Sequence, residues 1–165
     1  MGIEITGVED GVRLPTTALP VKVVEVEING IVAAAAYSAN DAFGDITTIP
    51  MPYPSGVIQW MMFLDLDDEG LEVDFMLCRE KFTPTADNAA FAPADGDAGR
   101  RGCIMEWVAF ATFTDLGAFQ VSINRNLGII YECADGKNLY CQGKSIGAPT
   151  IAAGSMPRLL LGVVP

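Results

Sequence analysis

Apolar and polar residues alternate along several stretches of the chain, and this alternation predicts β-strands. The clearest stretch covers residues 71–77, in which apolar side chains occupy every second position and Glu72 and Asp74 lie between them. A period of two residues places one face of a strand in a core and the other face in solvent. Residues 19–28 show the same pattern, with Glu25 and Glu27 between apolar residues, and predict another strand.

Three turn signals in the sequence predict β-hairpins. An apolar run enters an acidic turn that ends at Gly70, and an alternating strand leaves that turn. Asn29-Gly30 and Asp135-Gly136 are dipeptides that favour the positive φ angles of two-residue hairpin turns. The three predicted strand pairs are residues 57–66 with 71–78, 19–28 with 31–37, and 127–133 with 139–145.

Two long segments interrupt these strands. Residues 38–56 contain Pro50, Pro52 and Pro54, and because proline has no backbone N–H donor we expect a long connection here and not a central strand. Residues 79–102 are polar and rich in small residues, which predicts a second long loop. Further strands are predicted at residues 103–113, where the strand is expected to be buried, and at residues 119–123 and 159–164.

Many short strands with turns between them predict an all-β fold. We expect a single-domain β-sandwich that is jelly-roll-like, with long loops and at most short helical turns. Residues 19–165 form this domain, and residues 1–18, which carry scattered charges and no periodicity, form an N-terminal arm. A length of 165 residues suits one domain with a core large enough to fold without cross-links.

The chain is acidic and apolar at the same time. Ten basic and 21 acidic residues give a net charge of −11, which repels phosphate backbones and argues against nucleic-acid binding. Half of the residues are hydrophobic and only 19% are charged, so we expect a partner to cover part of the apolar surface. The longest apolar stretch near the start, residues 31–37, is too short to span a membrane, and no membrane contact is predicted.

The residue types argue against an enzyme, and no catalytic or cofactor-binding residue is predicted. The chain has no histidine, which excludes Ser-His-Asp triads, Cys-His pairs and imidazole metal sites. The carboxylate pairs Glu25/Glu27 and Glu72/Asp74 each share one face of a strand. Exposure of that face to solvent explains both pairs without a catalytic cleft.

The acidic turn half matches a calcium-binding loop. When Asp65 is counted as position one, Asp67, Glu69 and Gly70 occupy positions three, five and six. Position twelve, which needs a bidentate glutamate, is Met76. We therefore predict an Asp/Gly-rich turn, with Gly70 in the left-handed conformation, and no metal site.

None of the four cysteines has the C-x-x-C spacing of a zinc or redox motif. They are Cys78, Cys103, Cys133 and Cys141. Cys133 and Cys141 flank a predicted turn, so a disulfide between them is one alternative. In a chain of this length we favour free buried thiols that pack as small apolar residues.

Four residues are candidates for contact with a partner. Met51 and Tyr53 lie in the first long connection and are expected to be exposed at an interface. Arg100-Arg101 is the only basic doublet in the sequence and suits bidentate pairing with carboxylates of a partner, with a solvated loop as the alternative. Trp60 and Met61 are adjacent and both apolar, which predicts a strand covered on both faces, by a second sheet and by a neighbouring subunit.

Five short motifs follow one another between residues 57 and 164. They are the apolar strand, acidic turn and alternating strand at 63–75, the T-A-D-N-A-A loop at 85–90, the R-N-x-G strand at 125–128, the segment from L-Y at 139–140 to S-x-G-x-P-T at 145–150, and the L-x-L-G strand at 159–162. In this order and spacing they resemble the capsid decoration (cement) proteins of tailed bacteriophages. The cysteines and Arg100-Arg101 belong to none of these motifs.

The resemblance implies a virion protein that is assembled in the host cytoplasm and binds the outer surface of the capsid. It implies the major capsid protein as a partner, self-association as a homotrimer, and neither catalysis nor a cofactor. Two other functions stay open. One is a jelly-roll carbohydrate-binding module, which needs exposed aromatic side chains with carboxylates between them, and the other is a tail or baseplate component of the same kind of virion.

Overall fold

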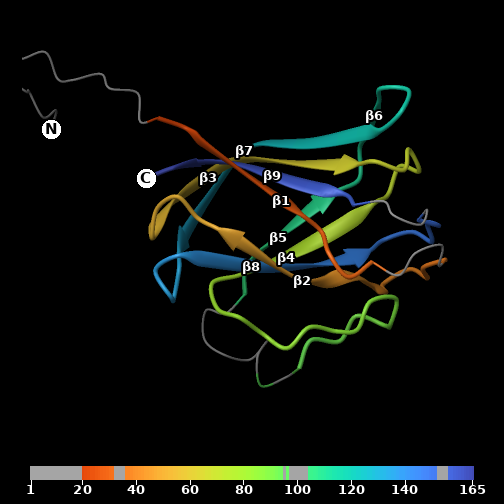
Figure 1. The fold of residues 1–165 in the computed structure, drawn as a ribbon, viewed down its shortest axis with the longest axis horizontal. Helices are drawn as coiled ribbons and strands as arrows, with labels where there is room; N and C mark the ends of the chain where they lie inside the picture. Colours follow the sequence, from red (N-terminus) through yellow and green to blue (C-terminus); the bar gives the residue numbers. More distant parts are fainter. Residues whose placement is uncertain (1–19, 32–35, 95, 97–103, 152–155) are drawn as a thin grey trace, which may run out of the picture.

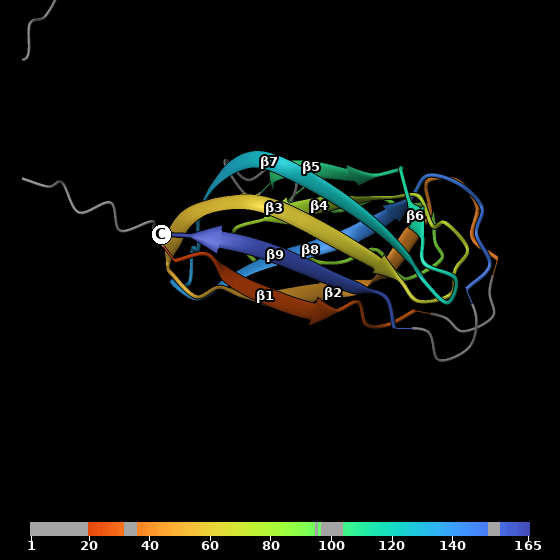
Figure 2. The same ribbon diagram turned by 90° about the horizontal axis from the view of Figure 1, so that it is seen from above.

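The computed structural model describes residues 20–31, 36–94, 96, 104–151 and 156–165. The described residues form two antiparallel sheets that pack face to face, seen as two layers in Figure 1 and from above in Figure 2. The strands are β1 (Lys22–Glu27), β2 (Ala42–Pro50), β3 (Ser55–Asp65), β4 (Val73–Cys78), β5 (Ile104–Phe110), β6 (Thr114–Asp115), β7 (Gln120–Glu132), β8 (Asn138–Ser145) and β9 (Arg158–Val164). The predicted arm at residues 1–18 lies outside the described residues.

The strand order is that of a jelly roll. One sheet has the order β1-β9-β3-β7-β6, and the other has the order β2-β8-β4-β5. Among the described strands, only β4–β5 and β6–β7 are neighbours both along the chain and within a sheet, so the other links carry the chain between the sheets. A jelly roll has this winding with eight strands, and β6 is a short addition at one edge. The predicted all-β, jelly-roll-like sandwich is confirmed.

The predicted hairpin of residues 57–66 with 71–78 is wrong. β3 belongs to the five-stranded sheet and β4 to the four-stranded sheet, so the acidic turn crosses from one sheet to the other. The crossing allows both strands to place phenylalanines in the same core, where the ring centroids of Phe63 and Phe75 lie 5.6 Å apart. Gly70 has a φ of 65°, which confirms the predicted left-handed glycine.

Asp65, the last residue of β3, organises this crossing. Its side chain is 1% exposed, and its carboxylate accepts the backbone N–H groups of Asp67, Glu69 and Leu71 at 3.0, 3.2 and 3.0 Å. A turn that leaves one sheet for another has no neighbouring strand to accept these donors, and buried donors without a partner are costly. The carboxylate of Asp65 therefore takes the place of the backbone carbonyls that would accept these N–H groups in a hairpin.

The hairpins predicted at Asn29-Gly30 and Asp135-Gly136 are also wrong. β1 pairs with β9, and the Asn29 carbonyl accepts the N–H of Asp45 instead of a returning strand. Residues 32–35 lie outside the described residues, and Ala36 bridges to Thr150. β7 and β8 lie in different sheets. Gly30 and Gly136 take the expected positive φ angles, but Asn29 and Asp135 do not, and the strands beside each dipeptide diverge.

The prediction of one long connection at residues 38–56 is wrong in its middle part, which forms β2. This strand is at the edge of its sheet, and β8 is its partner among the described strands. An edge strand tolerates proline because one of its sides has no partner, and Pro50 ends the strand. The missed signal is the run of β-branched residues at 46–49.

Two further predictions need correction. The strands expected at residues 119–123 and 127–133 are one strand, β7, which bulges where Asn126 and Gly128 take positive φ angles of 57° and 64°. The strand expected to be buried at residues 103–113 is β5, an edge strand whose Trp107 is 41% exposed. The strands predicted at residues 19–28 and 159–164 are confirmed as β1 and β9.

Residues 79–94 cover the outer face of the four-stranded sheet, and Figure 1 shows them on the side away from the other sheet. Phe82 of this segment packs with Met76 and Cys78 of β4 in a second buried cluster. Gln142 of β8, 1% exposed, fastens the segment by accepting the Thr85 N–H at 3.0 Å and donating to the Thr85 and Gly44 carbonyls at 2.6 and 2.9 Å. The chain therefore covers the second apolar face of this sheet itself.

Cys133 and Cys141 are buried and free, as predicted, Cys78 is buried, and Cys103 lies outside the described residues. Burial raises the pKa of the Cys141 thiol to about 12 and also raises the pKa of the Cys133 thiol. These side chains therefore pack as small, uncharged groups near neutral pH.

Asp65→Ala is expected to lower the free energy of unfolding by about 2–4 kcal/mol, because three backbone donors lose a charged acceptor. Asp68→Asn is the matched control: Asp68 is exposed in the same turn and has a φ of 60°, which asparagine adopts readily. Urea unfolding of both variants measures the difference. Equal stability of the two variants would show that the carboxylate of Asp65 does not organise the turn.

The stability contributed by Cys141 is expected to depend on pH. Its thiol has a pKa of about 12 in the folded protein and 9.0 in the reference state, so the contribution is complete below pH 9 and is lost as pH rises toward 12. At a pH of about 10.5 the loss is about 2 kcal/mol. Urea unfolding below pH 9 and at a pH of about 10.5 measures the free energy of unfolding of the wild type and of Cys141→Ala. Between these two pH values the free energy of unfolding should fall less in Cys141→Ala than in the wild type. An equal fall in both proteins would contradict the raised pKa of Cys141.

Candidate functional site

The outer face of the five-stranded sheet is apolar although the core lies on the other side of that sheet. Met61 of β3 points inward and is fully buried, while its neighbour Trp60 points outward and is partly exposed. Val23 on β1 is 60% exposed and Ile123 on β7 is 37% exposed. In the part of the chain that the structure describes, no segment covers this face as residues 79–94 cover the other sheet.

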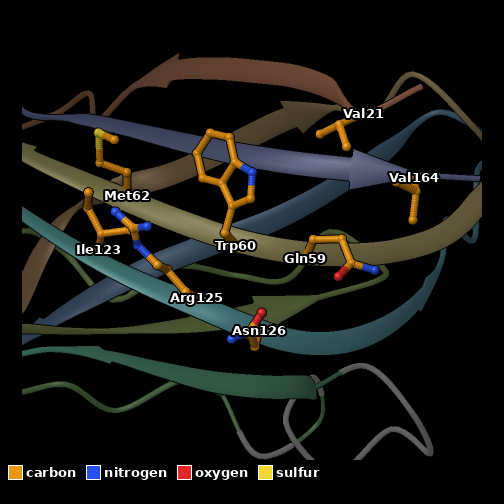
Figure 3. Close-up of a pocket in the computed structure, with 8 residues that line it drawn as sticks. All are labelled: Val21, Gln59, Trp60, Met62, Ile123, Arg125, Asn126 and Val164. Carbon is orange, nitrogen blue, oxygen red and sulfur yellow. The ribbon is translucent and has the colours of Figure 1, made fainter. Parts of the chain in front are cut away.

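Trp60 occupies the centre of a depression of about 530 Å³ on this face (Figure 3). We call it the Trp60 depression. Its lining residues come from β3, β7 and β9 and from the residue that precedes β1, and they are Val21, Gln59, Trp60, Met62, Ile123, Arg125, Asn126 and Val164. Figure 3 shows the indole between Met62 and Ile123 on one side and Gln59 and Val164 on the other. A volume of this size is within the range of binding sites for small ligands or side chains of a partner.

The indole of Trp60 lies directly on the backbone of β9. Trp60 and Gly162 are paired in the β3–β9 ladder, and a Cβ atom at position 162 would overlap Nε1, Cε2 and Cδ1 of the indole. Glycine is therefore required at this position, because any other residue displaces the ring. The ring is held against the sheet and forms a flat floor that remains partly exposed.

A bulge in β7 shapes the polar side of the depression. Trp60 pairs with Arg125 and Ile58 pairs with Ile129, so that the bulge at residues 126–128 lies opposite the single residue Gln59. Bulges bend a strand and redirect its side chains. Gln59, Arg125 and Asn126 are the polar residues that line this otherwise apolar depression, with Gln59 on the side of Val164 and the guanidinium of Arg125 on the side of Ile123 (Figure 3).

Charges on this face are few and mostly compensated. Arg158 of β9 binds Glu25 and Glu27 of β1 at 2.7 and 3.2 Å. The guanidinium of Arg125 is exposed, and it forms no ion pair with any residue that the structure describes. An exposed arginine without a carboxylate is notable in a chain with 21 acidic residues, and it gives the depression a local positive charge.

The structure does not bring the four predicted contact residues together. The expectation that Met51 is exposed is wrong. Its side chain is 9% exposed and belongs to the core. The backbone N–H of Met51 donates to the Lys137 carbonyl, which holds this part of the chain against the sandwich. Tyr53 is partly buried, and its carbonyl accepts the Tyr131 hydroxyl at 3.3 Å. Arg100 and Arg101 lie outside the described residues. A role for these residues at an interface stays a prediction.

The acidic residues fill structural positions in the described chain. Glu25 and Glu27 face solvent, as predicted, and Asp74 pairs with Lys144 at 3.4 Å. No group of three or more potential metal ligands occurs among the described residues. A helix long and apolar enough to cross a membrane is likewise not found in that part of the chain.

No protein-family model, no curated protein and no solved structure matches this chain. The function is therefore inferred from the geometry of the Trp60 depression. Trp60 was singled out by the sequence pattern, but Gln59, Arg125, Asn126 and Gly162 were not assigned a role. A signal for three of them was present: Arg125 and Asn126 open the R-N-x-G motif, whose glycine belongs to the β7 bulge, and Gly162 ends the L-x-L-G motif.

Gly162→Ala is expected to push the Trp60 indole off β9 and to lower the free energy of unfolding by about 1–3 kcal/mol. The measurement is tryptophan emission in a Trp107→Phe background, where Trp60 is the single tryptophan, and we expect a shift to longer wavelength. Gly147→Ala is the control, since a Cβ at that position meets nothing within 4 Å. Unchanged emission in the Gly162 variant would mean that the indole does not rest on this glycine.

Proposed function

We propose that this chain is a virion structural protein that binds the outer surface of a capsid and stabilises the contacts between major capsid subunits. The observation that carries the proposal is the apolar outer face of the five-stranded sheet, which surrounds the Trp60 depression and which no described segment covers. A sandwich needs one apolar face on each sheet, and a second apolar face is typical of a surface that a partner covers. The resemblance to capsid decoration proteins supplies the class of partner.

The composition of the face suits contact with proteins. Tryptophan and arginine are the residues that most often dominate protein interfaces, particularly when apolar neighbours exclude water around them. Trp60 is held rigidly over Gly162, so little side-chain entropy is lost on binding. Burial of apolar area contributes roughly 25 cal/mol per Å² before the costs of association, and many copies on one lattice add avidity.

Two of the motifs that carry the resemblance meet at this depression. The R-N-x-G motif provides Arg125, Asn126 and the bulge, and the L-x-L-G motif provides Gly162 beneath the indole. Residues more than 30 positions apart in the sequence thus support one small surface. This convergence favours a common binding role for the two motifs.

A jelly-roll carbohydrate-binding module is the second candidate, and Trp60 is the observation that favours it. A flat indole beside the side-chain amides of Gln59 and Asn126 can stack on a sugar ring and bind its hydroxyl groups. The surrounding valine, methionine and isoleucine side chains favour an apolar protein partner instead. Binding of the purified chain to a glycan array, lost in Trp60→Ala, would support this alternative.

The test uses capsids of the virus that encodes this chain, prepared without the chain and mixed with purified protein. We expect the protein to sediment with the capsids, to appear on their outer surface in electron micrographs, and to raise the temperature at which the shells open. Val23→Glu is expected to weaken binding at least tenfold, because it places a charge on the apolar face outside the Trp60 depression.

Ile146→Glu is the matched control for this experiment. Ile146 is an exposed apolar residue as well, but it lies beyond the four-stranded sheet, where its N–H donates to the Glu72 carbonyl. Equal binding by the two variants would show that the outer face of the five-stranded sheet is not the docking surface. A protein found only in the tail or inside the shell would rule out the proposed function altogether.

A further inference from the structure

The described chain begins beside the Trp60 depression. Pro20 is the first described residue, and the next residue, Val21, is 51% exposed and lines the depression. Nineteen residues precede this point in the sequence. Fully extended, a segment of that length reaches about 60 Å at roughly 3.3 Å per residue.

The sequence of residues 1–19 complements the depression. Its apolar residues are Met1, Ile3, Ile5, Val8, Val12, Leu14, Ala18 and Leu19. Three carboxylates, Glu4, Glu9 and Asp10, lie next to them. The depression offers an apolar floor for the first group and, for the second, the guanidinium of Arg125, which pairs with no carboxylate among the described residues.

The reach of residues 1–19 favours a neighbouring copy as the source of the segment. A domain of this length is about 40 Å across, so a reach of about 60 Å extends to a neighbour.

We propose that the Trp60 depression binds residues 1–19 of a second copy of this chain. The apolar residues of that segment cover Trp60, Met62 and Ile123, and its carboxylates pair with Arg125. The inference goes beyond the proposed function and requires only that copies of the chain associate. It assigns the depression to contact between copies and leaves the remainder of the apolar face for the capsid.

Charge exchange in the full-length chain tests the proposal. One variant carries Arg125→Glu, and a second carries Glu4→Lys, Glu9→Lys and Asp10→Lys together. Sedimentation should show that each variant alone associates at least tenfold more weakly than the wild type. An equimolar mixture of the two variants should associate again, because each depression then meets a segment of opposite charge.

Lys137→Glu controls for the change in net charge, which is the same as in Arg125→Glu. Lys137 is exposed in the turn between β7 and β8, away from the lining of the depression, and this variant should associate like the wild type. A second readout is the emission of Trp60 in the Trp107→Phe background, which should shift to shorter wavelength as the chain associates.

Three results would overturn the inference. They are a wild-type chain that stays monomeric at all concentrations, association that neither charge variant weakens, and a mixture that fails to recover. A monomeric chain that still binds capsids overturns the inference and leaves the proposed function standing. Recovery in the mixture together with no capsid binding supports the inference and removes the proposed function.

Discussion

Both sheets carry apolar side chains on their outer faces as well as in the shared core, and the rest of the structure depends on how these outer side chains are covered. Two stacked sheets bury one face of each sheet in a shared core, so each outer face needs a cover of its own. The four-stranded sheet receives one from residues 79–94, which Gln142 fastens in place. The outer face of the five-stranded sheet keeps Val23 and Ile123 exposed around a fixed indole, which is why binding is assigned there.

Periodicity predicted where strands lie but not which strands pair. An alternating segment must place its apolar residues in a core. β1, β4 and β9 lie where strands were predicted, and each places apolar side chains in the core. A turn dipeptide such as Asp135-Gly136 fixes the local φ angles and says nothing about whether the next strand stays in the same sheet. In a jelly roll most connections cross from one sheet to the other. The prediction that successive strands pair as hairpins was therefore wrong for most of this chain.

Long-range contacts decided the parts that the sequence pattern did not reveal. Asp65 appears in the sequence as one carboxylate in an acidic cluster, and only the crossing between sheets explains its burial and its three N–H partners. Gly162 appears as one glycine among 17, and its requirement depends on Trp60, 102 positions earlier. The adjacency of Trp60 and Met61 was informative because two neighbouring apolar side chains on a strand need two separate covers.

Local composition, more than net charge, determines what the outer face of the five-stranded sheet can bind. A charge of −11 distributed evenly would make copies of this chain repel one another. At this face Glu25 and Glu27 are compensated by Arg158, and Arg125 adds a positive charge that no described carboxylate pairs with. The Debye length at physiological salt is about 8 Å, so carboxylates on the far side of a domain about 40 Å across have little influence here. The acidic residues elsewhere therefore discourage association through other surfaces, while this face remains available for apolar contact.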